Sequence, residues 1–475
     1  MSGGGASFDR LGSAVADGAG GVVVTGTYSD TATFAGVAYA DAGATKDTML
    51  WRIDANATSQ WFARVRGNSK EAMHAVARQD NGTNFVGGGY FSATSTFGYD
   101  SSNPARGVTL TATAEWDAVL WKVSTLGTTM WAVKGGGGLN TDFNFLRAVA
   151  AAPVTANGGA GGGATGGGEA AVVGVGRIAL STVTFGGVVL VGDGVIQGEL
   201  VMWNVDATSG ATKWAVRAGS APPSSGSASF GGQLLAVAWG ADYGGGGAGS
   251  SAATSDGAFA SVGGHFTAAG YFYDTAVFGG VSVTSHGNSG AVVWRVSGEG
   301  TTLWAVSGGG PGKDNLHAAA AVSRVVYPID PGASCASCDV VVGGSFTERA
   351  TFGGVSLLGR GTVIDAVLWR ISSLGTTQWA VHGGGTSFDR VYAVAHDGGG
   401  GVIAAGYFTN TATFGDVVLR GAGDRDALLW WGVQISSTPP LPPSTSTQIH
   451  LTHALGVESG LILNIKPLKR DVAIW

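Results

Sequence analysis

The sequence predicts an all-β protein, a β-propeller of six four-stranded blades, and three observations lead to this prediction. A segment of roughly 50–60 residues recurs six times along the 475-residue chain. Within each copy the apolar runs are short and are bounded by Gly, Asn, Asp or Ser, which is typical of strands joined by turns. No run of the chain keeps the 3.6-residue period of an amphipathic helix over three turns.

Two landmarks define the copies, a Phe that follows Thr or Val and a Trp at the end of an apolar run. The Phe residues are Phe34, Phe97, Phe185, Phe278, Phe352 and Phe414, and the Trp residues are Trp51, Trp121, Trp203, Trp294, Trp369 and Trp430. These landmarks divide 1–435 into units at about 3–68, 69–139, 140–221, 222–312, 313–385 and 386–435. The fourth unit is the longest, and its glycine-rich insertion at 244–255 leaves a degenerate seventh blade as an alternative.

The first five units contain four apolar runs in the same order and the sixth contains the first three, and we expect each run to form one strand. The first run is small and alanine-rich (392–397), the second is valine-rich (340–346), the third reads DAVLWRI (365–371) and the fourth reads TTQWAV (376–381). The alanine-rich run suits the innermost position, where the blades of a propeller crowd the axis. Stacking of neighbouring blades buries both faces of each sheet, which explains why the runs are almost continuously apolar.

A second Trp follows the first by ten residues in most units, and both are expected in the core. Trp121 and Trp131 flank a turn, and a hairpin loop that ends in a left-handed Gly127 would place them directly opposite each other. We therefore expect the two rings on one face of the blade. The sixth unit lacks the fourth run. Its last strand is supplied by the tail at 447–475, or the blade has three strands, or, as we favour, the chain is a fragment of a longer protein.

The order of motifs GG-x(2)-FD-x(3)-AVA, VxVxGxF, TATFGG, DAxLWRI and GTTxWAV resembles the bacterial-type β-propeller repeat family, known for seven-bladed β-propellers. The resemblance covers about residues 3–435. It implies a propeller fold and a secreted or cell-surface protein, and it implies no fixed activity. This chain departs from the family in having six units and long glycine-rich insertions.

Composition argues against two classes of partner. The net charge is −6 and no basic patch or stripe occurs, so nucleic-acid binding is not expected. No apolar stretch is long and uncharged enough to insert into a membrane. No signal-peptide core follows the first residues, which by default predicts the cytosol and leaves the compartment open against the family resemblance. Residues 436–446 are a Pro- and Ser-rich linker, and 447–475 match no repeat.

One polar feature recurs in the loop before the first strand, and it forms the candidate site. Its members are Asp9, Arg10, Asp142, Asp314, Asp389 and Arg390, and Glu71 holds a comparable place. In a propeller these loops meet at one mouth of the central channel, where an acidic ring would bind a cation or a polar ligand. The alternative, which we favour, is that each Asp closes its own turn through backbone hydrogen bonds.

Few other residues indicate chemistry. Cys335 and Cys338 are expected to form a small loop disulfide or to stay two thiols, because a zinc site needs four ligands and there is no second CxxC. His74, His317 and His396 fall in or beside first strands. They would bind a metal only if they approached the channel, and we expect ordinary strand-end residues. No metal and no other cofactor is predicted.

These patterns favour a non-catalytic binding or scaffold module, for a protein or a glycan, over an enzyme. An enzyme with a site at the channel mouth, of the glycan hydrolase or lyase type, would need carboxylates or histidines that converge with shifted pKa values. The low content of charged residues, 12% of the chain, argues against it. A purely structural spacer is the third alternative, since propellers host many functions.

Overall fold

The computed structural model describes seventeen stretches of the chain. They are residues 3–6, 9–40, 46–67, 69–79, 84–99, 106–138, 142–152, 171–178, 182–192, 198–220, 231–241, 264–322, 339–360, 363–396, 401–421, 423–433 and 451–457. The regular elements in these stretches are all β-strands, so the predicted all-β class is confirmed. Among these residues no helix has the length and apolar character needed to cross a membrane.

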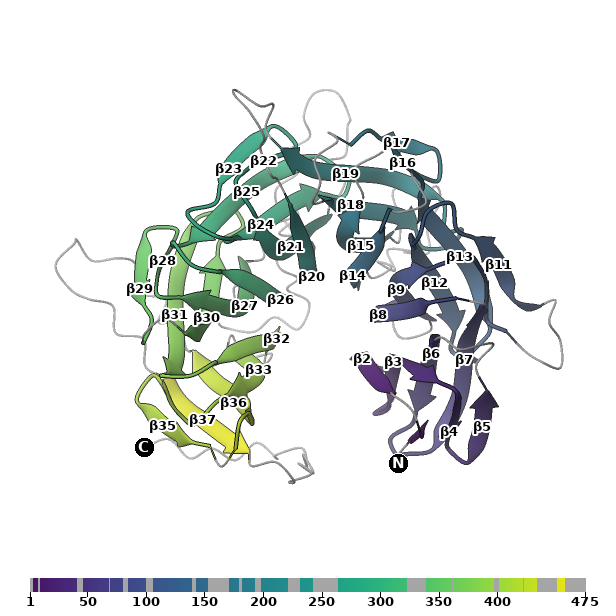
Figure 1. Ribbon diagram of the computed structural model, residues 1–475, viewed down its shortest axis with the longest axis horizontal. Coiled ribbons are helices and arrows are strands. Elements are labelled where there is room, and N and C mark those ends of the chain that lie inside the picture. The colour runs from purple at the N-terminus through teal and green to yellow at the C-terminus, as the bar shows by residue number, and fades with distance from the viewer. Residues whose placement is uncertain are drawn as a thin grey trace, which may run out of the picture.

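Six antiparallel four-stranded blades follow one another along the chain, as predicted (Figure 1). The first and innermost strands are β2 (Arg10–Ala16), β8 (Glu71–Gln79), β14 (Phe145–Ala151), β20 (Gly232–Ala241), β26 (Asn315–Val322) and β32 (Arg390–His396). The second strands are β3 (Val22–Ser29), β9 (Asn84–Phe91), β15 (Ala171–Ile178), β21 (Gly264–Phe272), β27 (Asp339–Thr347) and β33 (Val402–Phe408). The third strands are β6 (Lys46–Ile53), β12 (Asp117–Ser124), β18 (Glu199–Asp206), β24 (Gly290–Ser297), β30 (Ile364–Ile371) and β36 (Asp426–Val433). The fourth strands are β7 (Ser59–Gly67), β13 (Thr129–Gly136), β19 (Thr212–Ser220), β25 (Thr302–Gly309), β31 (Thr377–Gly385) and β37 (Leu451–Val457).

The Phe landmark of each unit belongs to an additional short hairpin that the sequence analysis did not assign. The hairpins are β4 (Thr31–Phe34) with β5 (Val37–Ala40), β10 (Thr94–Phe97) with β11 (Val108–Thr111), β16 (Val183–Phe185) with β17 (Val188–Leu190), β22 (Thr275–Phe278) with β23 (Val281–Thr284), β28 (Arg349–Phe352) with β29 (Val355–Leu358), and β34 (Thr411–Phe414) with β35 (Val417–Arg420). From the second unit on, each hairpin pairs with the fourth strand of the preceding blade and extends that sheet to six strands. The first hairpin pairs instead with β1 (Gly3–Gly5). The five hairpins from the second unit on therefore each link two neighbouring blades.

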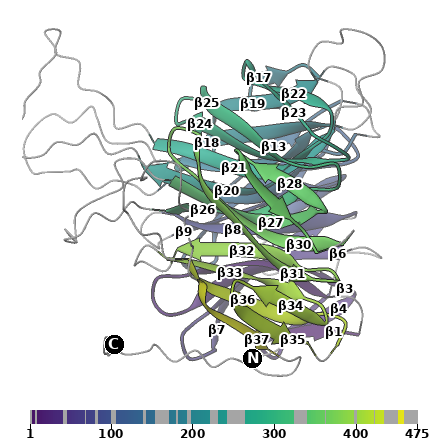
Figure 2. The same ribbon diagram turned by 90° about the vertical axis from the view of Figure 1, so that its left-hand side faces the viewer.

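The blades form an arc whose innermost strands surround a common centre (Figure 1). The arc is open between β2 and β32, and the two ends of the chain lie on either side of the opening. Leu11 in β2 is 54% exposed, whereas its counterparts Met73, Leu146 and Leu316 are buried against the preceding blade. The exposure of Leu11 agrees with the absence of a blade on that side among the described residues. Figure 2 shows the same blades from the side.

The prediction that paired Trp residues share one face is wrong. Trp121 pairs with Ala132, and Trp131 pairs with Lys122, because a β-bulge shifts the register of the hairpin between Lys122 and Val123. Successive residues of a strand point to opposite faces, so a shift of one residue separates the two rings. Trp121 is buried in the cluster between the first and second blades, and Trp131 in the cluster between the second and third.

In the first four blades the second Trp contacts the hairpin turn of the next blade. The Nε1 atoms of Trp61, Trp131, Trp214 and Trp304 donate hydrogen bonds to backbone carbonyls in the hairpin turn of the following blade, at 2.7, 3.1, 2.6 and 2.8 Å. The glycine of that turn lies against the same Trp and has a positive φ, for example +81° at Gly375. The first blade has no preceding Trp in the described residues, and its turn carries Ala57 at this position.

The sixth blade is completed by the tail. Leu451–Val457 forms β37, which pairs antiparallel with β36, so the alternative in which the tail supplies the fourth strand is confirmed. The insertion at 244–255 and most of the linker and tail, 436–450 and 458–475, lie outside the described residues, as do Cys335 and Cys338. Within the described residues the number of blades is six.

Candidate functional site

Each innermost strand contains a β-bulge at the same place. The register against the second strand shifts between Leu11 and Ser13 in the first blade, and correspondingly in the other five. The residues at the bulges are Gly12, His74, Arg147, Leu235, His317 and Tyr392. A bulge leaves its extra residue out of the ladder and redirects the side chain.

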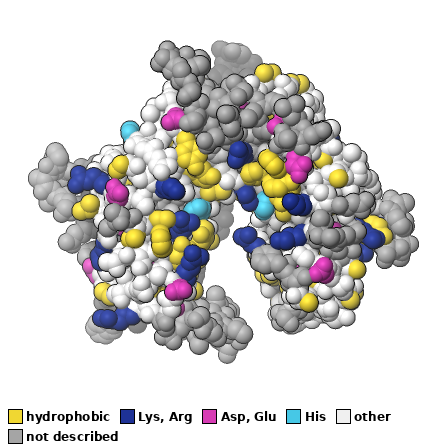
Figure 3. Space-filling model, viewed as in Figure 1, with side chains coloured by type: hydrophobic (Ala, Val, Ile, Leu, Met, Phe, Trp, Pro, Cys, Tyr) yellow, Lys and Arg dark blue, Asp and Glu magenta, His cyan; other side chains and the backbone are white. Residues whose placement is uncertain are grey.

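The bulge residues of all six blades line one cavity of about 850 Å³. Figure 3 shows Lys, Arg and His side chains gathered around the central opening. Further lining residues come from the first two blades and their loops, and among them are Arg10, Lys46, Lys70, Glu71, Tyr90 and Trp116. The cavity therefore lies at the mouth of the central channel, nearest to the first two blades.

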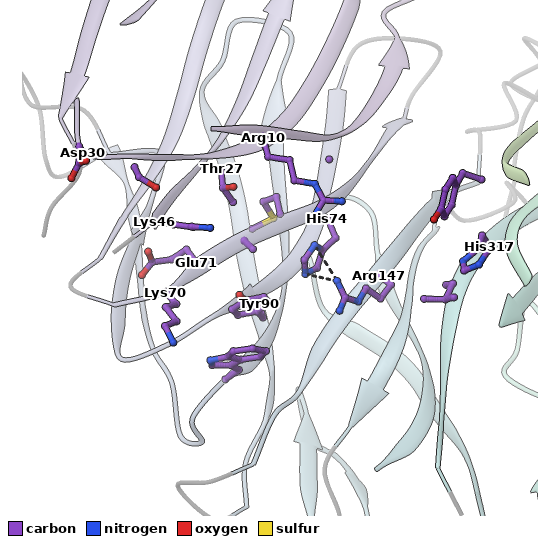
Figure 4. A pocket seen from close by; sticks show the side chains of 18 residues that line it. Arg10, Thr27, Asp30, Lys46, Lys70, Glu71, His74, Tyr90, Arg147 and His317 are labelled. Atoms are coloured by element: carbon purple, nitrogen blue, oxygen red, sulfur yellow. Dashed lines mark hydrogen bonds between the residues drawn. The ribbon is translucent and has the colours of Figure 1, made fainter. Parts of the chain in front are cut away.

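His74 and Arg147 are in direct contact across the second and third blades (Figure 4). Nη1 of Arg147 lies 3.2 Å from Nε2 of His74 and donates a hydrogen bond to the neutral ring. Burial lowers the pKa of His74 to about 3, and the charges of Arg147 and Arg10 act in the same direction. The imidazole is therefore neutral at pH 7 and accepts from the guanidinium.

An aromatic wall lies beside this pair. The rings of Tyr90 and Trp116 are stacked, with centroids 4.2 Å apart and an interplanar angle of 13°. Phe143 meets Trp116 edge to face at 4.7 Å. On the opposite side of the channel the ring of Tyr392 lies 5.1 Å from that of His317, and burial lowers the pKa of His317 to about 4. The cavity thus combines flat apolar surfaces with charged groups, as small-molecule sites do.

Glu71 is the buried carboxyl of the cavity. Its Oε1 accepts a hydrogen bond from the Ser95 hydroxyl at 2.7 Å, and its Oε2 has no partner among the described residues. The pKa of Glu71 is raised to about 8, mainly by burial and also by the nearby charge of Asp47, against the effect of the Ser95 hydrogen bond. Glu71 is therefore mostly protonated at pH 7.

Most of the predicted acidic residues hold the backbone together. Oδ2 of Asp314 and of Asp389 accepts the amide hydrogen of Gly310 and of Gly385, both at 2.8 Å. The other oxygen of each accepts from the amide of Thr347 or Thr409, where the second strand of the same blade ends. Asp9 accepts from Gly5 in the same way. These bonds are the turn-closing bonds that the sequence analysis favoured. None of these aspartates lines the cavity.

The remaining predicted site residues divide between the cavity and its surroundings. Arg10 lines the cavity. Asp142 is buried, and its backbone carbonyl accepts from the Trp116 amide. Arg390 lies outside the lining, with Nη1 3.4 Å from the Tyr392 hydroxyl.

The histidines correct a second expectation. His74 and His317 lie inside the innermost strands β8 and β26 and not at their ends. The bulge in each strand directs the ring into the channel. Within the described ranges no cluster of three His, Cys, Asp or Glu side chains is close enough to hold a metal ion. The sequence analysis missed Arg147, Leu235 and Tyr392. Alignment of the six first strands would have shown them, because each stands between a constant apolar residue and Ala.

Comparison with known proteins gives neither a family nor a function for this chain. No family model matches the chain, and no curated protein matches it.

Proposed function

We propose that this chain is a non-catalytic binding module whose ligand, a glycan or a segment of another protein, enters the mouth of the central channel. One observation carries the proposal. The bulge residues of all six blades line one cavity, five of them with side chains, and these include His, Arg, Leu and Tyr while their neighbours stay apolar or small. The flanking positions keep an apolar residue on one side and Ala or Ser on the other, so it is the position facing the cavity that carries the polar and aromatic groups.

The proton affinities of the histidines support binding over catalysis. A general base works best when its pKa lies near the operating pH. The pKa values of His74 and His317 are lowered to about 3 and about 4, so both rings are neutral and weakly basic at pH 7. They suit hydrogen bonding to a ligand better than proton transfer.

A screen of the purified chain on glycan and protein arrays, followed by titration of the selected ligand, tests the proposal. Tyr392→Ala removes a bulge ring that is 48% exposed, and Phe388→Ala removes a similarly exposed ring that does not line the cavity. We expect Tyr392→Ala to weaken binding and Phe388→Ala to leave it unchanged. Equal effects of the two variants, or no ligand on either array, would contradict the proposal.

A second candidate is an enzyme that acts on a glycan at the same mouth, and Glu71 favours it. A carboxyl that is protonated at neutral pH can donate a proton to a leaving group. Turnover of an array-selected glycan by the wild-type chain, with none by Glu71→Gln, would favour the enzyme over the binding module. Binding without turnover in both proteins would favour the module.

We also infer membership of the bacterial-type β-propeller repeat family and a secreted or cell-surface location. The order and spacing of the six repeated motifs support both inferences.

A further inference from the structure

Resting on the proposed binding site, we infer that the ligand is an acidic saccharide that presents an oxyanion, a carboxylate or a sulfate, to Arg10 and Arg147. These two arginines, the neutral ring between them and the neighbouring aromatic wall carry the inference.

Arg147 is a partly buried cation that has no acidic partner within the part of the chain that the structure describes. Its Nη1 contacts His74, its Cζ lies 4.8 Å from the centroid of the Phe145 ring, and its buried Nε has no hydrogen-bond partner among the described residues. A buried guanidinium is normally paired with a carboxylate or another anion. Arg147 therefore offers at least its Nε donor, which no described residue uses.

Arg10 brings a second positive charge to the same place. Figure 4 shows Arg10 and Arg147 on two sides of the His74 ring, and the charge of each lowers the pKa of that histidine. The charge of Arg10 also lowers the pKa of Arg147, after the larger effect of burial. Two like charges held at one cavity repel each other, and a bound oxyanion would convert that repulsion into two charge-assisted hydrogen-bonded contacts.

The acidic residues that line the cavity do not neutralise the pair. Glu71 is mostly protonated at pH 7, as shown above. Asp30 lies at the far rim, directed away from both arginines (Figure 4). The lining also includes Lys46 and Lys70, so the cavity is positive overall although the chain is negative. A positive cavity in an acidic protein selects for anions.

The aromatic surfaces favour a saccharide over a simple anion or an acidic peptide. The stacked rings of Tyr90 and Trp116 and the half-exposed ring of Tyr392 offer flat faces within one cavity. The C–H faces of a sugar ring pack well on such surfaces. The volume of about 850 Å³ is within the range of small-ligand sites, so it accepts a short oligosaccharide.

Calorimetric titration of the full chain with four probes tests the inference. The probes are a galacturonic acid oligomer, a sulfated heparin-derived oligomer, a neutral cello-oligomer of the same length and a polyglutamate peptide. The variants are Arg147→Gln and Arg10→Gln, with Arg420→Gln on an exposed outer strand as the matched control. Arg10 is exposed, so its variant stays informative if Arg147→Gln does not fold.

We expect at least one acidic saccharide to bind, and each cavity variant to weaken it by about tenfold or more, as loss of a charged hydrogen bond would. Arg420→Gln should bind like the wild type, and added salt should weaken binding. If the neutral oligomer binds equally well and the arginine variants have no effect, recognition of an oxyanion is contradicted. The proposed binding function is then still supported. If polyglutamate is the one probe that binds, and its binding depends on the arginines, the claim that the ligand is a saccharide is contradicted. No binding of any probe would overturn the inference, and the array screen then decides the module separately.

Discussion

Replacement of Gly375 by Ala tests how neighbouring blades are held together. A Cβ at this position would lie 3.0 Å from Cγ and 3.1 Å from Cδ2 of Trp304. Trp304 cannot move aside freely, because its Nε1 donates to the Ser373 carbonyl at 2.8 Å and Cζ of Arg295 lies 4.8 Å from its ring. The substitution therefore combines backbone strain with overpacking.

Gly354 provides the matched control. Its φ is +91°, close to the +81° of Gly375, and a Cβ there would meet no atom within 4 Å. Ala in the left-handed region costs roughly 1–2 kcal/mol, which both variants share. Overpacking of a fixed neighbour adds about 1–3 kcal/mol, which only Gly375→Ala should show. We expect losses in the free energy of unfolding of about 1–2 kcal/mol at Gly354 and about 2–5 kcal/mol at Gly375.

Urea denaturation followed by tryptophan fluorescence measures both variants against the wild type. The fluorescence reports directly on Trp environments, and circular dichroism of the same samples reports on the strands. Equal losses at the two glycines would refute the contact between the turn glycine and the Trp of the preceding blade as a stabilising feature.

Three further outcomes are expected. Deletion of 436–475 removes β37, so the exposed edge of β36 should make the chain self-associate in light scattering, and a monomer of unchanged stability would contradict this. The free energy of unfolding should fall as the pH rises from 6.5 to 8. Burial raises the folded-state pKa of Glu71 to about 8 and of Asp314 to about 7, so the folded chain loses these protons in this range. The unfolded chain has already lost them at lower pH. Glu71→Gln should reduce that slope in urea titrations at the two pH values, and an unchanged slope would count against it. Trp379→Ala should cost about 3–5 kcal/mol with ligand binding unchanged, since this ring is 7% exposed in the core, and a loss of binding without a loss of stability would place the ring in a site.

The repeated features of the fold follow from the sequence. Six copies of the repeat predict six blades, and the alanine-rich run predicts the innermost strand, because both depend on residue types that recur. The missing fourth run of the last unit left three alternatives open, and the pairing of β37 with β36 decides for the tail. The turn-closing role of Asp314 and Asp389 followed from the ordinary behaviour of Asp before a strand.

Register could not be predicted in the same way. The faces of Trp121 and Trp131 depend on a bulge near Lys122, and the direction of His74 depends on a bulge between Met73 and Ala75. A bulge is a relation between two strands, and one extra residue reverses every assignment beyond it. The centre of the candidate site is made of bulge residues, so it was the part of the molecule whose side-chain directions were hardest to predict from the sequence. Comparison of the six copies would still have shown the position, because there the repeat changes from blade to blade.

Hydrogen exchange of the full chain with and without its array-selected ligand tests most directly whether the bulge residues form the binding site. We expect ligand-dependent protection in the innermost strands at 71–79, 145–151 and 315–322, and none in the outer hairpins. Protection confined to the outer hairpins at 275–284 and 349–358, with unchanged exchange in the innermost strands, would contradict a site at the channel mouth.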